Sequence, residues 1–244
     1  MKTKQLMKIE LYRFWLSLPL FIIGCILALG VMFLLKTNPQ DLRTSDMVSD
    51  SINSAMKIMG MIFCIIISIV IAVYVGREYR LKTILHEVIR GYTQSKIVVS
   101  KTISCGVVFA FMLWIIQMIF FLVSSSAREY ITFGRSILFF FYLLHICSAA
   151  LLYVMISRNG IIGGCITFCR FEFVDLLIAI LVNLLPEKIS YVLKCFLPVL
   201  QWGLLINSEA NIAPIHYVGV IGSTAIEYVF LLWIVLIRAK KEDY

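Results

Sequence analysis

Four ionisable side chains interrupt stretches of this 244-residue chain that are otherwise apolar: Arg170, Glu172, Asp175 and Glu227. A charge near the centre of a bilayer costs about 2.5–3.5 kcal/mol on insertion scales, so such a group needs a partner or water. On an α-helix Glu172 and Asp175 share one face, and Arg170 is displaced toward another. The pattern therefore predicts either a structural ion-pair cluster or contact with a transported substrate, and Glu227 is expected to face the interior of a helix bundle.

Residues for other kinds of chemistry are present without the spacing they need. A hydrolase inside the membrane needs a metal motif or a nucleophile with a base, yet no HExxH occurs, Ser223 has no evident partner, and the three histidines are far apart: His86, His145 and His216. Cys165 and Cys169 are four residues apart and could bind a soft metal, although small apolar packing is the favoured interpretation. No Gly-x-x-x-x-Gly-Lys-Ser/Thr loop is present to hold phosphates. We expect no catalytic residue, no metal and no cofactor in this chain.

Composition places these residues in a membrane protein. Hydrophobic residues make up 61% of the chain and charged residues 15%, whereas soluble domains have about 25% charged residues. A helix needs about 20 apolar residues to cross the hydrocarbon core. Six such runs predict an all-α integral membrane fold of one domain, with spans at 16–35, 56–75, 102–123, 136–156, 160–184 and 217–237.

The basic residues predict how the chain is oriented. Cytoplasmic loops carry the excess of lysine and arginine, and most of the 22 basic residues lie in the N-terminus, in 76–101, at Arg158 and in the C-terminus. We expect both termini to be cytoplasmic. This bias also accounts for the net charge of +8, so we do not interpret it as a nucleic-acid-binding surface.

The segment 76–101 contrasts with the apolar runs on either side of it. Its apolar residues recur every three to four positions from Leu81 to Tyr92, and charged residues cover the other side, which predicts an amphipathic helix. Glu78 precedes Lys82 by four residues, the favourable order for an ion pair, and Gly91 predicts a stop with an unusual backbone dihedral. The pattern fits either a helix on anionic lipid headgroups or a docking surface for a soluble partner.

The order of motifs along the whole chain resembles the permease subunits of type-2 ABC exporters. The resemblance rests on Gly76-Arg77-Glu78-Tyr79 at the end of the second span, on Thr83-Ile84-Leu85, and on the run from Gly91-Tyr92-Thr93 to Lys101. Family members usually have glycine where this chain has Lys82, and arginine where it has Gln94. Glu10-Leu11-Tyr12-Arg13 is similar to the family's interfacial helix at the N-terminus.

This resemblance implies that 76–101 is a coupling segment that docks on a separate ATP-hydrolysing subunit, which would bind ATP and Mg²⁺. The implied contacts are Arg77, Glu78, Arg80, Lys82, His86, Glu87, Arg90, Gly91 and Tyr92, with the charges facing water and the partner. It also implies a re-entrant helical pair at 185–214, pairing with a second permease copy or a different permease, and a bacterial cytoplasmic membrane location. The size and the Gly-Tyr-Thr form are most similar to permeases for lantibiotic immunity, bacitracin resistance or export of amphipathic peptides.

Two other classes stay open. A self-sufficient secondary transporter or channel would show inverted repeats and paired broken helices, and the sequence shows no such repeat. An intramembrane hydrolase is the third class. Under the leading interpretation Glu227, Glu172, Asp175 and Arg170 are the candidate residues of the substrate pathway, and the substrate is an amphipathic peptide.

Overall fold

The computed structural model describes residues 3–15, 22, 45–123, 133–194, 196 and 214–240, and apart from short turns these residues are helical. No strand occurs among these residues. The helices, with two π-helical turns named η1 and η2, are α1 (Thr3–Trp15), α3 (Ser45–Arg80), α4 (Thr83–Ile89), α5 (Gln94–Lys101), η1 (Thr102–Val107), α6 (Val108–Val123), α8 (Phe133–Ser157), α9 (Gly160–Phe168), η2 (Cys169–Val174), α10 (Asp175–Asn183), α11 (Glu187–Lys194) and α13 (Pro214–Lys240).

Within these described ranges, four helical stretches are long and apolar enough to cross a membrane: Gly60–Arg80, Gln94–Ile119, Phe133–Ser157 and Pro214–Arg238. They coincide with the expected second, third, fourth and sixth spans, and they indicate a multi-pass membrane protein. The expected first span, 16–35, lies outside the described residues except for Ile22. The expected re-entrant segment, 185–214, is described only up to α11, at Phe196 and at Pro214, so six spans and a re-entrant pair stay predictions.

The expected fifth span, 160–184, is one continuous helical run built from α9, η2 and α10. It is not among the four stretches named above that are long and apolar enough to cross a membrane. Its middle is a π-helical turn, Cys169–Val174, in which hydrogen bonds close over five residues instead of four. The π turn changes which side chains share a face, and this proves important for the charged residues that it carries.

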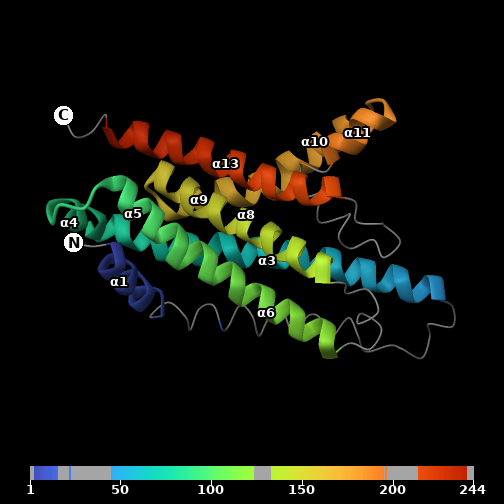
Figure 1. Ribbon diagram of the computed structural model, residues 1–244, viewed down its shortest axis with the longest axis horizontal. Helices are drawn as coiled ribbons and strands as arrows, with labels where there is room; N and C mark the ends of the chain where they lie inside the picture. Colours follow the sequence, from blue (N-terminus) through green and yellow to red (C-terminus); the bar gives the residue numbers. More distant parts are fainter. Residues whose placement is uncertain are drawn as a thin grey trace.

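The segment 76–101 is divided among helices differently from what the sequence predicted. Helix α3 continues through the motif Gly76–Tyr79 and ends at Arg80, and α5 continues through η1 into α6. The separate element between the two long helices is therefore the short helix α4. Gly91 has φ of 85°, which confirms the unusual dihedral expected there. Figure 1 shows α1, α4, the start of α5 and the end of α13 together at one end of the bundle, with α11 at the opposite end.

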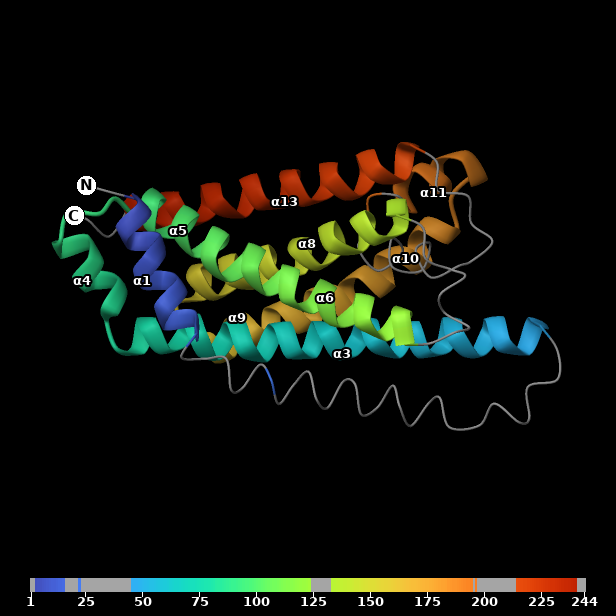
Figure 2. The same cartoon turned by 60° about the horizontal axis from the view of Figure 1, so that its bottom comes forward.

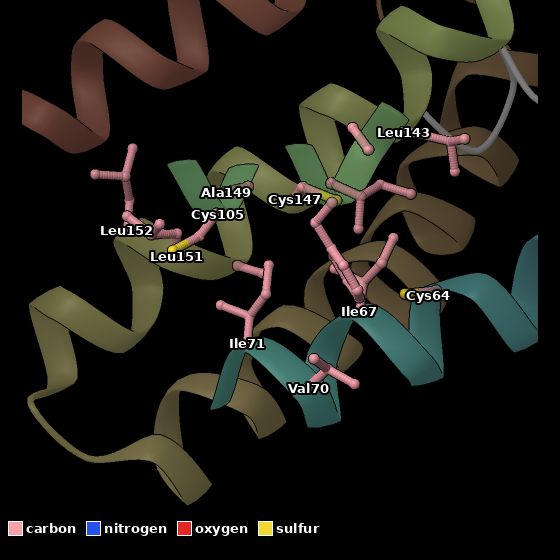
Figure 3. Packing of buried hydrophobic residues seen from close by; sticks show 14 of the residues in the cluster. Cys64, Ile67, Val70, Ile71, Cys105, Leu143, Cys147, Ala149, Leu151 and Leu152 are labelled. Carbon is pink, nitrogen blue, oxygen red and sulfur yellow. The ribbon is translucent and has the colours of Figure 1, made fainter. Parts of the chain in front are cut away.

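The core lies around α8, against which α3, η1 and α6 pack. Figure 3 shows Ile67 and Ile71 of α3 facing Cys147 and Leu151 of α8, and all four side chains are at most 2% exposed. Lipid is as apolar as these side chains, so close packing rather than exclusion of water holds membrane helices together. Helix α8 is the most enclosed of the four candidate spans, and it therefore forms the centre of the bundle.

Small residues bring α3 and α9 into close contact, side by side in Figure 2. A Cβ atom added to Gly76 would lie 2.5 Å from the Cα of Gly160, and one added to Gly164 would lie 2.9 Å from the Cβ of Ala72. Helix backbones approach this closely in membranes where both carry glycine or alanine. This contact fixes α9, and with it the charged turn that follows, against α3.

Candidate functional sites

Two groups of polar side chains are buried in the described part of the chain. The end cluster consists of Glu10, Arg13, Glu78, Glu87 and Lys101, at the α4 end of the bundle. The central cluster consists of His145, Tyr153, Arg170, Asp175 and Glu227. Each joins helices that are distant in sequence, so each is a candidate functional site.

Lys101 is the centre of the end cluster. Its side chain is fully buried at the last residue of α5, and its Nζ donates hydrogen bonds to Glu10 Oε1 at 2.8 Å and Glu78 Oε2 at 2.5 Å. Tyr74 of α3 also donates to Glu10, with its hydroxyl 3.1 Å from Oε2. A buried ammonium group is tolerable only where carboxylates compensate for its lost hydration. Lys101 thus ties α5 to both α1 and α3.

Arg13 connects the same cluster to α4. Its guanidinium forms an ion pair with Glu87, and its Nη1 lies 3.5 Å from Glu10 Oε1 and 3.7 Å from Glu78 Oε1. Glu87 is 3% exposed, so this contact holds one face of α4 against the bundle. The carboxyl of Glu87 therefore links α4 to α1 directly, and through the shared arginine to α3.

The end cluster contains one more acidic group than basic groups, three carboxyls against two cations. Burial raises the pKa of Glu87 above its usual value, against the opposing charges of Lys101 and Arg13. Two carboxylate oxygens, Glu78 Oε1 and Glu87 Oε2, are buried without a hydrogen-bond partner among the described residues. A proton held by one of these carboxyls would balance the charge of the cluster and supply a donor.

The expected ion pair between Glu78 and Lys82 does not form. Helix α3 ends at Arg80, and Lys82 has a left-handed backbone with φ of 55°, so the four-residue helical spacing between the two is lost. Glu78 and Glu87 were also expected to face water, but both are buried in the end cluster. The reason is that Arg13 and Lys101, both distant in sequence, supply their counter-charges.

The other residues expected to contact a partner lie on α4, at the end of α3 and in the turns on either side of α4. Arg77, Arg80, Lys82, His86 and Arg90 are exposed, and Tyr92 is half-buried. Leu81 and Ile89 are also exposed, at 53% and 72% of their surfaces, although the sequence pattern placed them on the packed side. The outward surface at this end of the bundle is therefore both basic and apolar.

The central cluster is built around Glu227, at the middle of α13. Its Oε2 lies 2.7 Å from His145 Nε2, and its Oε1 accepts a hydrogen bond of 3.0 Å from the hydroxyl of Tyr153. Both partners are on α8, the central helix. The expectation that Glu227 faces the bundle interior is confirmed, since its side chain is 16% exposed.

Arg170 extends this cluster to the fifth helical run. It forms an ion pair with Asp175, which is fully buried, and its Nη2 lies 3.6 Å from Glu227 Oε2. The prediction that Glu172 and Asp175 share one face, with Arg170 displaced toward another, is wrong. Arg170 and Asp175 are five residues apart across the π turn, so they share a face, while Glu172 lies half-buried beside the thiol of Cys64.

Sequence reasoning missed the composition of both clusters. The sequence pattern presented His145 only as one of three histidines too far apart for catalysis, and Lys101 only as the last residue of the motif that begins at Gly91. One signal was available, because a lysine beside a long apolar run needs a carboxylate partner and Glu10 and Glu78 are near the same predicted membrane boundary. The spacing alone could not show which carboxylate it would contact.

Comparison with known proteins gives no family assignment: no protein-family model matches the chain, and no curated protein matches it significantly.

Proposed function

We propose that the chain is the membrane-spanning subunit of an ATP-driven exporter of the ABC type, working with a separate ATPase subunit that docks on α4. The observation that supports this most is the two-sided construction of α4. Its inner face is fixed by the pairing of Glu87 with Arg13, while its outer side presents Ile89, His86 and Arg90. A short helix with a rigid inner attachment and a free outer face is suited to carry movement from a soluble partner to the spans.

The transported substrate on this proposal is an amphipathic peptide, which the chain would export or clear from the bacterial cytoplasmic membrane. The central cluster supplies the polar groups for it. Glu227 is close to His145 and Arg170 but keeps part of its surface accessible, so it can exchange a protein partner for a cationic group of the substrate. Helix α13 is largely exposed on its remaining faces, which leaves room for a second permease to complete the pathway.

The test is to purify the tagged chain from its native membrane and to identify what binds it. We expect an ATPase subunit containing a phosphate-binding loop, bound one to one with the permease, with two permeases in each complex. Arg90→Glu should lower the ATPase bound per permease, because charges at an interface steer and register the partner. The matched control is Lys188→Glu, an exposed charge reversal on α11 at the opposite end of the bundle.

Several outcomes would contradict the proposal. Transport by the purified chain in vesicles without ATP or an ATPase would point to a secondary transporter, in which the central cluster would carry protons or ions. Equal loss of ATPase in Arg90→Glu and Lys188→Glu would show a general effect of charge. An active complex with a single permease copy would exclude the paired arrangement.

A further inference from the structure

A long groove follows the outside of the contact between α3 and α9. Its volume is about 950 Å³, and it is lined by Ile65, Ile69 and Val73 of α3 and by Ile161 and Phe168 of α9, among others. The groove exists because the glycine contact brings the two backbones together and leaves few side chains to fill the space beside it. It is separate from both polar clusters.

Three arginines line one end of this groove: Arg77, Arg80 and Arg158. All three are exposed, and no acidic residue is among the described residues that line the groove. Arg77 and Arg80 make no ion pair with any residue in the described part of the chain. The groove is therefore strongly positive at one end and apolar along the rest of its length.

Its length fits one leaflet of a bilayer. Twelve residues separate Ile65 from Arg77 along α3, which at 1.5 Å per residue is about 18 Å. Half of a hydrocarbon core is about 15 Å. Ile69 and Val73 lie between these ends and are 54% and 46% exposed, so an acyl chain could lie against them. The arginines then lie at the level of the lipid phosphates.

We propose that this groove binds an anionic phospholipid from the leaflet on the α4 side, with its phosphate on Arg77, Arg80 and Arg158 and one acyl chain along Ile65, Ile69 and Val73. Guanidinium groups hold phosphate through paired charge-assisted hydrogen bonds, and basic pockets between membrane helices bind such headgroups. A cationic amphipathic peptide would be repelled by the same three arginines. The assignment does not rest on the proposed exporter function, and it gives Arg77 and Arg80 a lipid headgroup in place of the partner contact that the sequence resemblance implied for them.

The binding is measured by reconstituting the full chain in nanodiscs of phosphatidylcholine with phosphatidylglycerol, extracting it in mild detergent, and weighing retained lipid by native mass spectrometry. The chain should retain phosphatidylglycerol in preference to phosphatidylcholine. The triple variant Arg77→Gln, Arg80→Gln, Arg158→Gln should reduce that preference by about a hundredfold. The matched control is Lys82→Gln with Arg90→Gln, which removes exposed basic residues near the same end but outside the groove.

A second variant tests the apolar part. Val73→Trp adds bulk at an exposed position in the groove, so it should reduce lipid retention while leaving the arginines and the fold intact. Each single arginine variant gives the same test if the triple variant is poorly folded. Equal retention of both lipids by the unmodified chain would overturn the proposal, as would equal losses in the triple variant and its control. Unchanged retention in Val73→Trp, or a lipid-free dimer sealed at this groove, would overturn it too.

Discussion

The end cluster and the central cluster both compensate for charges buried between helices, and they differ in how exposed their central residues are. Both bury charge among helices, but the residue at the centre of each cluster differs: Lys101 is fully enclosed, whereas Glu227 keeps 16% of its side chain exposed. Each cluster also has a partly exposed arginine, Arg13 at 29% and Arg170 at 23%. The end cluster joins α1, α3, α4 and α5, and the central cluster joins α8, η2, α10 and α13. The comparison indicates a rigid attachment for α4 and a polar centre that can change partners.

The largest effect is expected from removing the centre of the end cluster. Lys101→Met would leave Glu10 and Glu78 buried without their cation, and breaking a buried pair from one side costs about 3–5 kcal/mol. We expect the purified chain to unfold at a much lower temperature, measured by its thermal melting in detergent. Lys96→Met, on an exposed position of the same helix, is the control. Equal stability of the two variants would show that the end cluster is not a structural attachment.

The glycine contact links the two regions, because α3 carries Glu78 and α9 leads to Arg170. Gly76→Ala places a methyl group 2.5 Å from Gly160 Cα, where only backbone movement can relieve the overlap. Overpacking of this kind costs about 1–3 kcal/mol. The melting temperature should fall relative to Gly222→Ala, whose added Cβ would meet its nearest atom, on Phe196, at 3.6 Å. Similar melting of both variants would mean that α3 and α9 can separate freely.

The central cluster should be more sensitive in function than in stability. Glu227→Leu removes the hydrogen bonds to His145 and Tyr153, and bonds between membrane helices contribute about 1–2 kcal/mol at most. Glu227→Gln keeps the shape and a hydrogen-bonding group, so it should assemble normally but lower transport or substrate-stimulated ATPase activity. Normal transport by an assembled Gln variant would contradict a role in the substrate pathway. Attention would then move to Glu172, which lies outside this cluster.

The smallest effect concerns the acidity of the end cluster. The folded chain holds a proton on Glu87 more tightly than the unfolded chain, because burial raises the pKa of this group. The associated stability is present below the unfolded pKa of about 4.3 and is lost as the pH rises through the folded pKa. The melting temperature should fall over that interval. Glu87→Gln should weaken this dependence, and an identical pH profile in both proteins would contradict the assignment.

The sequence predicted the membrane-spanning helices better than it predicted the ends of the helices around α4. The apolar runs at 56–75, 102–123, 136–156 and 217–237 predicted their helices, because a lipid environment requires continuous apolar helices of a minimum length. The basic segment and Gly91 predicted a break and a short helix at α4. The exact ends of these helices were less predictable. The charged segment 76–101 was expected to be a separate element, but α3 extends into it as far as Arg80 and α5 begins within it at Gln94.

The sequence by itself determined that this protein is helical and membrane-embedded, and that its charges need internal partners. Only the tertiary structure decided which partners they have. Glu78 contacts Lys101 rather than Lys82 because α3 ends at Arg80, two residues before Lys82. Arg170 contacts Asp175 because a π turn places residues five apart on one face. Hydropathy is a local property that a sequence records directly, whereas charge pairing depends on helix ends, π turns and packing distances that form only when the helices assemble.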